Sequence, residues 1–516
     1  MTRQKSDNRS VLQGSRKGVV TRATEGGKAI ADDEQVFQLS LFNGTAEKEQ
    51  SAELRDGGKR IPSIQIGSPK PLTIGNQRTS VSLEKMIVCL DRAEKTVFAN
   101  KGASGPDRQT VNDVREHWGE TKPNLIRALN NGTYKPGDIR RVWIPKYGGG
   151  ERGLGIPNVI DRIVQTALKM ILEPLYEPTF HASSHGFRPN RSCHTAIREA
   201  QSYVAEGYEF VVDIDLKDFF NRVNHQRLLA KIETKVEDVR ILKLIGQMMK
   251  AKVVLPTGVV IETVEGVPQG GTLSPLLSNI YLDELDSELM RRGHKFVRYA
   301  DDCNIYVKSE LAGQRAMASI RTFIEKKMRL EVNEKKSAVA RPKDRHFLGF
   351  TLRHNKDKSA VEIVLSERSL ERINQKIVEL TPRNFGNSIE SCTKRVNQYL
   401  TGWIGFFGIC TKGIQSILQR IDSHIRRRLR AILLKQWKRK RTIVRKLVAM
   451  GGNKRTVMRA IYGQRRRVWA MSCMSIVHRY LTNNFIETLG FRTVYSLWKE
   501  YQRKGVAPVQ MMMELV

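Results

Sequence analysis

The sequence predicts an α+β protein in which an antiparallel sheet with helices comes first and an all-helical, basic region follows. Two observations predict the sheet: at 296–307 two runs that favour strands flank Ala300, Asp301 and Asp302, and a second apolar stretch at 209–220 also contains acids. Such runs favour strands, and the short break in the first is typical of a hairpin turn. A third observation predicts the helical region, because beyond about residue 365 apolar side chains recur at helical spacing among many arginines and lysines.

The chain of 516 residues is long enough for several domains and is strongly basic. Its 88 lysines and arginines outnumber 53 aspartates and glutamates, which gives a formal net charge of +35. A charge of this size favours a polyanionic partner, nucleic acid before a membrane surface. The six cysteines are scattered, which argues against a disulfide framework or a zinc module and fits a reducing cytoplasm. We expect no membrane span and no secretory signal, because apolar runs of the necessary kind are missing.

Carboxylates lie at the ends of both predicted strands. Asp301 and Asp302 are adjacent, so on a strand one side chain can face a shared site while the other supports it. An isolated Asp-Asp pair is more often a solvated surface turn. The second acidic strand, with Asp213 and Asp215, favours the shared site, because Mg²⁺ prefers carboxylate oxygens. Two strands that bring aspartates to one point predict a two-metal site for phosphoryl or nucleotidyl transfer.

These motifs resemble those of a known family. The box Tyr-Ala-Asp-Asp at 299–302 resembles the catalytic box of reverse transcriptases, and Asp215 with Phe220 resembles the acidic box that precedes it. The wider pattern resembles the bacterial reverse transcriptase/maturase proteins encoded by group II introns, with the boxes in family order over roughly 83–502.

The resemblance implies a right-hand polymerase fold with fingers, a palm built on an antiparallel sheet, and an all-α thumb. The expected divisions are a flexible polar and basic extension at 1–82, fingers and palm at 83–360, a thumb or maturase domain at 361–445, and a basic helical DNA-binding segment at 446–516. Helical periodicity begins at Leu83. The Gly/Pro loop at 101–107 is similar to the family signature of the segment that clasps the template.

In the predicted fingers, strands near 140–146 and 151–156 flank a glycine-rich loop, and a helix follows. The residues alone allow a basic hairpin without a specific partner. The resemblance implies that Lys146 contacts a triphosphate as a point charge and Arg152 as a bidentate fork, with Arg162 as a further candidate. The next box, 185–192, implies that Arg188 and Arg191 contact template phosphates.

Asp215 is the expected metal ligand of the acidic strand, and Asp213 is not, because the family places the ligand five residues before an aromatic residue, here Phe220. Phe220 would pack under the sugar of the incoming nucleotide and reject a 2′-hydroxyl, which favours dNTPs. The alternative is that Phe219 and Phe220 both belong to the core, and we expect at least one of them to do so.

Two further boxes supply nucleotide contacts. Gln269 lies in a glycine-rich loop before a helix, where glycines allow close approach to a nucleotide, and it is expected to touch the base or the template backbone. Lys336 aligns with a family lysine near the pyrophosphate leaving group, where it could act as a general acid, and Lys335 is the alternative. A solvated basic face is the other interpretation of both lysines. Residues 347–350 resemble a hairpin that supports the primer.

The helical region is expected to grip the primer–template duplex and to dock structured RNA. It resembles the family's maturase domain, although a solvated basic helix would show the same composition. The predicted nucleic-acid contacts of this part and of the DNA-binding segment are Arg426, Arg427, Arg428, Lys438, Arg439, Lys440, Arg441, Arg465, Arg466 and Arg467. Many relatives continue into a His-Asn-His nuclease with cysteine pairs, and we expect none here because this chain has no such pairs.

The predicted function is that of an RNA-directed DNA polymerase encoded by a group II intron. It would bind the intron RNA, assist splicing and support mobility by target-primed reverse transcription, with Asp215, Asp301 and Asp302 around two Mg²⁺ ions, or Mn²⁺ in their place. The expected partners are intron RNA, an RNA template with a DNA primer, target DNA and dNTPs, in the bacterial cytoplasm and at the nucleoid. The alternatives are a domesticated reverse transcriptase of phage defence or of a retroelement without an intron, and a splicing chaperone with a vestigial polymerase.

Overall fold

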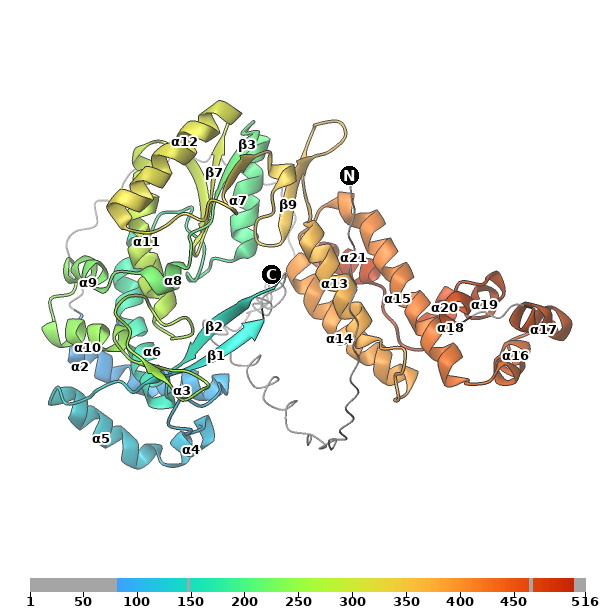
Figure 1. The fold of residues 1–516 in the computed structure, drawn as a ribbon, viewed down its shortest axis with the longest axis horizontal. Coiled ribbons are helices and arrows are strands. Elements are labelled where there is room, and N and C mark those ends of the chain that lie inside the picture. Colours follow the sequence, from blue (N-terminus) through green and yellow to red (C-terminus); the bar gives the residue numbers. More distant parts are fainter. Residues whose placement is uncertain (1–80, 146–148, 464–466, 505–516) are drawn as a thin grey trace, which may run out of the picture.

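The computed structural model describes residues 81–145, 149–463 and 467–504 (Figure 1). The predictions for Lys146, Arg465 and Arg466 and for the extension before residue 81 lie outside these ranges. Within them, no helix is long and apolar enough to cross a membrane.

The fold is mixed α and β, as the sequence predicts. Sheets and their covering helices form one half of the molecule, and the helices from α13 to α21 form the other, with β9 between them (Figure 1). The hairpin of β1 and β2 lies on the side of the first half that faces the helical half (Figure 1).

A four-stranded antiparallel sheet in the order β6-β7-β3-β8 is the centre of the first half. Its strands are β3 (Phe210–Ile214), β6 (Lys295–Tyr299), β7 (Asp302–Val307) and β8 (Ala338–Ala340). Side chains alternate between its two faces. Val212 and Ile214 join one hydrophobic cluster, whereas Val211 and Tyr306 join another on the opposite face. Register is therefore fixed by burial on both sides.

A second sheet carries the predicted fingers hairpin. Its order is β2-β1-β4-β5, with β1 antiparallel to β2 and parallel to β4. These strands are β1 (Ile139–Pro145), β2 (Glu151–Ile156), β4 (Val253–Val254) and β5 (Val260–Ile261). A two-stranded sheet of β9 (Phe350–His354) and β10 (Val361–Leu365) leads into the helical half.

The helices of the first half begin at residues that suit helix N-termini. Thr110 and Ser192 each form a capping box, in which side chain and backbone satisfy one another's open hydrogen-bonding groups. The helices are α2 (Leu83–Val88), α3 (Leu90–Asn100), α4 (Val111–Glu116), α5 (Trp118–Asn130), α6 (Val159–Tyr176), α7 (Cys193–Ala205), α8 (Phe219–Arg222), α9 (His225–Glu233), α10 (Val239–Met249), α11 (Ser274–Arg291) and α12 (Glu310–Phe323).

The helical half buries the apolar stripe that the sequence predicts. Val396, Leu400 and Trp403 on α14 are at most 1% exposed, and they pack with the buried face of α15. The helices are α13 (Glu367–Leu380), α14 (Ile389–Phe407), α15 (Gln415–Gln436), α16 (Lys440–Ala449), α17 (Lys454–Tyr462), α18 (Val468–Met471), α19 (Ser475–Tyr480), α20 (Asn483–Thr488) and α21 (Val494–Lys504).

The hydrophobic core does not divide where the predicted segments do. One cluster covers 81–332, and the other joins α7 and the outer face of the central sheet to 347–498. The boundary predicted at 445/446 falls inside α16, and Leu447 and Trp498 belong to the same cluster as Trp403. The described residues after 445, predicted as the DNA-binding segment, therefore share a core with the preceding helices instead of folding as a separate unit.

Candidate active site

The acidic turn predicted at 299–302 is the tip of the β6–β7 hairpin. Tyr299 pairs with Asp302, which leaves Ala300 and Asp301 as the two turn residues. Ala300 has φ 56°, in the left-handed region that costs an L-residue roughly 1–2 kcal/mol. Gly186 lies directly behind it, because a Cβ there would come within 2.2 Å of the Ala300 nitrogen. A glycine is therefore required at 186 for the turn to sit where it does.

A fully buried arginine holds the turn in place. Arg298 donates to both carboxylate oxygens of Asp286, at 2.7 and 2.6 Å, and to the carbonyl of Ala300 at 2.8 Å. Its third link is Asn279, whose amide also donates to the carbonyl of Gly186 at 2.8 Å. This network was not predicted from the sequence. The available signal was a charged residue inside an apolar strand, which burial allows only when the charge is paired.

Asp215 follows the end of β3, on the neighbouring strand. Its backbone N–H donates to Ser337 Oγ at 3.0 Å, and its carbonyl accepts from the N–H of Asn333 at 2.8 Å. The segment that holds Asp215 thus also carries Lys336, whose Nζ lies 3.3 Å from Asp215 Oδ2. Of the two lysines left open by the sequence, Lys336 forms this ion pair.

The three predicted carboxylates influence one another electrostatically. Desolvation by the surrounding atoms, followed by the charges of Asp301, Asp213 and Asp215, raises the pKa of Asp302 to about 8, although its side chain keeps access to solvent. Desolvation also raises the pKa of Asp301, and Arg152 and Lys336 oppose that effect. The carboxylates also repel one another, and a bound cation relieves that repulsion, so a cation is favoured here.

The donor chemistry fits Mg²⁺. Within the described residues, no cluster of three or more His, Cys, Asp or Glu side chains is arranged as a ready metal cage. Mg²⁺ does not require one, because it is usually held by one or two carboxylates together with water and substrate phosphates. Asp215 on one strand and Asp301 with Asp302 on the next could supply those carboxylates.

The predicted triphosphate contacts differ in their surroundings. Arg152 lies on β2 opposite Ile144, is exposed, and is close enough to lower the pKa of Asp301 against the larger effect of desolvation. Arg162 is 3% exposed and donates to the carbonyl of Ala103 at 2.6 Å, and burial lowers its pKa to about 10. Arg162 therefore ties the 101–107 loop to α6, which argues against a triphosphate contact.

Gln269 lies in a loop that is clamped between β2 and α6. Its carbonyl accepts from the N–H of Gly155 at 2.7 Å, and Gln165 accepts from the N–H of Thr272 at 3.0 Å. At Gly270, φ is 126° and a Cβ would lie 2.4 Å from the Gly155 carbonyl oxygen. The glycines thus serve this close backbone packing, and the Gln269 side chain stays half-buried.

The two adjacent phenylalanines, Phe219 and Phe220, differ in burial, as the sequence allowed. Phe219 is 2% exposed and packs in the core, which confirms that at least one of the pair is a core residue. Phe220 is half-buried and contacts Phe219 edge to face, with ring centroids 5.4 Å apart. Phe220 remains the candidate for contact with a sugar.

Arg188, one of the arginines predicted to touch nucleic acid, is turned inward. Arg188 is 8% exposed, donates to Glu177 at 2.8 Å, and donates to the carbonyls of His181 and Ser184. Arg191 donates to the carbonyl of Ala182 and is half-buried. The guanidinium of Arg188 is satisfied by the protein, so its burial argues against contact with a template.

Arg428 is the second inward-facing arginine. It is 6% exposed and donates to Thr381 Oγ1 at 2.5 Å, to the Thr381 carbonyl at 2.6 Å and to the Val378 carbonyl at 3.2 Å. These carbonyls belong to the end of α13, where they are open to a cationic partner. The position favours a structural role for Arg428.

The remaining basic residues keep more contact with solvent. Lys438, Arg439, Arg441 and Arg467 are exposed, and Arg426, Arg427 and Lys440 are half-buried. Arg427 stacks over Trp469 at 4.0 Å from the ring centroid, and Lys440 lies over Tyr462 at 5.5 Å. Apart from Arg427 and Lys440, which pack on aromatic rings, this surface is free to meet a polyanion.

Comparisons with known proteins match both halves of the chain. The family model "Reverse transcriptase (RNA-dependent DNA polymerase)" matches residues 144–352, and "Group II intron, maturase-specific domain" matches residues 370–448. Among solved structures, a chain of the "Partial Cas6-RT-Cas1--Cas2 complex" is similar at 22% identity with a TM-score of 0.31, over 47% of this chain and 42% of that chain, a likeness too low to carry an argument.

Curated relatives point to the same family. The group II intron-encoded protein LtrA of Lactococcus lactis subsp. cremoris is 32% identical over 51% of this chain and 54% of its own length, so the chain spans about half of that relative. Protein YkfC of Escherichia coli K12 is 33% identical over 51% of this chain and 80% of its own length. A putative COX1/OXI3 intron 2 protein of Saccharomyces cerevisiae is 29% identical over 46% of this chain and 29% of its own length. The chain therefore belongs to the family of group II intron-encoded reverse transcriptase/maturase proteins.

Proposed function

We propose that this chain is an RNA-directed DNA polymerase encoded by a group II intron. It binds the intron RNA, assists its splicing, and supports intron mobility by target-primed reverse transcription. One observation carries the proposal: Asp215 and the Asp301–Asp302 pair lie at the ends of adjacent antiparallel strands, with Lys336 at 3.3 Å from Asp215. In this proposal the central sheet is the palm, the β1–β2 hairpin belongs to the fingers, and α13 to α16 form the thumb.

The proposed chemistry is transfer of a nucleotide to a primer. Two divalent cations, when bound to these carboxylates, supply charge stabilisation at the attacking 3′-oxygen and at the leaving pyrophosphate. Lys336 donates a proton to the pyrophosphate, and Arg152 binds the triphosphate through its planar guanidinium. Phe220 lies against the sugar and excludes a 2′-hydroxyl, while the loop of Gln269 supports the base.

The helical half supplies the nucleic-acid grip. Exposed lysines and arginines from α15 to α18 neutralise phosphates, and the affinity for RNA consequently falls as salt rises. The maturase-specific match over 370–448 covers most of this half, which favours an intron-linked protein over a domesticated reverse transcriptase. Three carboxylates at one site are hard to reconcile with a vestigial polymerase.

The test is extension of a DNA primer on an RNA template with dNTPs and Mg²⁺, by wild type and by Asp301→Asn. We expect extension by the wild type and loss of it in the variant, with RNA affinity unchanged. The matched control is Asp357→Asn, an exposed aspartate in the turn between β9 and β10. Extension by Asp301→Asn at the wild-type rate would refute the site. Splicing of the cognate intron RNA, with and without the protein, tests the maturase role separately.

A further inference from the structure

A further aspartate, Asp213, lies on β3, close to the end of the strand that Asp215 follows. Asp213 precedes Asp215 by two residues, so both side chains lie on one face of the sheet. Its register partners are Asn304 on β7 and Ala338 on β8. The proposed chemistry does not use Asp213, yet its charge raises the pKa of Asp302, after desolvation and Asp301. An unpaired carboxylate at this place would also attract Lys336.

Arg345 neutralises this carboxylate. Its Nε and Nη2 donate to Asp213 Oδ2 at 2.9 and 2.5 Å. The side chains of Arg345 and Asp213 are 26% and 18% exposed, so solvent screens the pair only partly. Arg345 comes from the segment after β8, directly behind the short 3-10 helix Pro342–Asp344.

The same guanidinium also holds the backbone of Lys336. Nη2 of Arg345 donates to the Lys336 carbonyl at 2.5 Å, so one planar group joins Asp213 to the residue whose ammonium faces Asp215. The hydrogen bonds of Asn333 and Ser337 to Asp215 anchor the rest of that segment. Arg345 adds the contact at Lys336 itself.

We propose that Arg345 is a positioning residue for Lys336. By tying the Lys336 carbonyl to Asp213 it fixes the direction from which the ammonium reaches the metal site and the leaving pyrophosphate. It also neutralises the Asp213 carboxylate. The inference rests on the proposed function, in which Lys336 is the proton donor, and it assigns the backbone position of that donor to Arg345.

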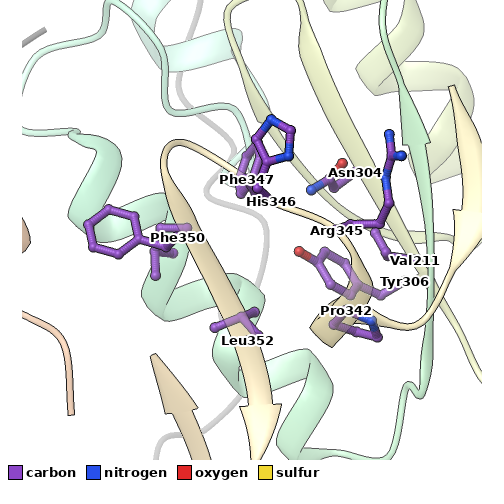
Figure 2. Close-up of a pocket in the computed structure, with 10 residues that line it drawn as sticks. Val211, Asn304, Tyr306, Pro342, Arg345, His346, Phe347, Phe350 and Leu352 are labelled. Atoms are coloured by element: carbon purple, nitrogen blue, oxygen red, sulfur yellow. The ribbon is translucent and has the colours of Figure 1, made fainter. Parts of the chain in front are cut away.

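Arg345 borders a cavity of about 20 Å³, lined also by Asn304 and Tyr306 (Figure 2). A cavity of this size has room for one water molecule. Asn304 Oδ1 is buried there without a hydrogen-bond partner in the described part of the chain. Because the Arg345 side chain itself reaches solvent, a shorter side chain at 345 extends this existing cavity toward solvent, and we expect Arg345→Ala to fold.

The experiment is a double-mutant cycle on single-turnover dNTP incorporation at a primed RNA template. Arg345→Ala, Lys336→Ala and the double variant are compared with wild type at saturating Mg²⁺. If Arg345 acts through Lys336, the maximal rate falls about tenfold in Arg345→Ala, part of the roughly 10²–10⁴-fold that a positioned proton donor contributes. The dNTP concentration for half-maximal rate should change little, and the double variant should match Lys336→Ala alone.

The matched control is Arg341→Ala. Arg341 belongs to the same segment, is 52% exposed and pairs with Glu209 at 3.3 Å, away from Lys336. It should keep the wild-type rate. Asp213→Asn is the milder second variant: it weakens the anchor without opening space, and its smaller loss should also vanish in the Lys336→Ala background.

Two results would overturn the inference. One is that Arg345→Ala lowers the maximal rate of incorporation by the same factor in the wild-type and Lys336→Ala backgrounds, which would show an effect independent of the lysine. The other is full restoration by Arg345→Lys, because a point charge lacks the planar fork that spans Asp213 and the carbonyl. A wild type without any incorporation would instead refute the proposed function, so the two failures are distinguishable.

Discussion

At the scale of single residues, the candidate site depends on groups that carry no chemistry of their own. Arg298 and Asp286 are both fully buried, and their pair holds the turn that presents Asp301. Removal of one partner of a buried ion pair leaves an uncompensated charge, which typically costs about 3–5 kcal/mol. Substitutions at 286 or 298 would therefore reduce activity through the fold.

Substitutions at Phe220 and Phe219 should have different effects, the first on sugar selectivity and the second on stability. Phe220→Val removes bulk from the half-buried position, and we expect rNTPs to be incorporated more readily relative to dNTPs, with little loss of stability. Phe219→Ala should cost about 3–5 kcal/mol, as core phenylalanines do, and leave sugar selectivity in place. Primer extension with dNTP and rNTP mixtures, beside thermal unfolding, measures both. Selectivity that changes with Phe219 instead of Phe220 would contradict the assignment.

Burial also explains which residue-level predictions the sequence could not make. The count of arginines indicates a polyanionic partner but not the direction of any one side chain. Arg188 turns inward to donate to the carboxylate of Glu177, and Arg428 turns inward to donate to the carbonyl of Thr381. Packing of the fold brings these partners to the arginines. Arg345 and Asp213 lie 132 residues apart in the chain, so no local pattern could join them.

At the scale of elements, α15 carries the buried arginine Arg428, and the start of α16 carries the exposed arginine Arg439. Arg428→Ala should lower the melting temperature, because it removes the donor to the buried carbonyl of Thr381, directly after α13, at a cost of about 1–3 kcal/mol. Arg439→Ala, at the exposed start of α16, should leave melting unchanged and weaken RNA binding. The slope of log affinity against log salt should fall by about one for Arg439→Ala and not for Arg428→Ala. A reversed pattern would show that Arg428 is the RNA contact.

The docking of α21 should depend on pH through Asp422. This residue is 2% exposed and accepts from the N–H groups of Val494 and Tyr495, at 2.6 and 3.1 Å. Desolvation raises the pKa of Asp422 from 3.8 to about 6, so the folded state holds the proton more tightly than the unfolded state does. Its stability contribution, at most about 3 kcal/mol, is present below pH 4 and lost as pH rises through about 6.

The measurement is the free energy of unfolding of wild type and Asp422→Asn between pH 4 and 7. The wild type should lose stability relative to the variant as pH rises. Glu390→Gln, an exposed carboxylate on α14, should keep the wild-type dependence. A constant difference between wild type and Asp422→Asn would contradict the assigned shift.

Elements with strong periodic patterns were predictable. The hairpin at 296–307, the strand before Asp215 and the strands that flank residue 148 all form as expected, because alternation and turn chemistry act locally. The helices of the C-terminal half follow from their apolar stripe. The β1–β4 pairing could not be foreseen, since two-residue strands carry almost no pattern of their own.

At the scale of the whole molecule, one continuous hydrophobic cluster joins the outer face of the central sheet to the C-terminal helices. That cluster places the basic helices beside the sheet that carries the carboxylates (Figure 1). The sequence predicted both parts, but their shared core arises from packing between distant segments, which composition does not encode.

If Asp215, Asp301 and Asp302 form one metal site, a metal ion bound there can be mapped on the chain. With Fe²⁺ in place of Mg²⁺, ascorbate and peroxide generate radicals that cut the backbone next to the ion. We predict cuts in both 213–217 and 299–303, suppressed by excess Mg²⁺ and absent in Asp301→Asn. Cuts confined to other segments, in a protein that still extends primers, would show that these three carboxylates do not share a metal ion.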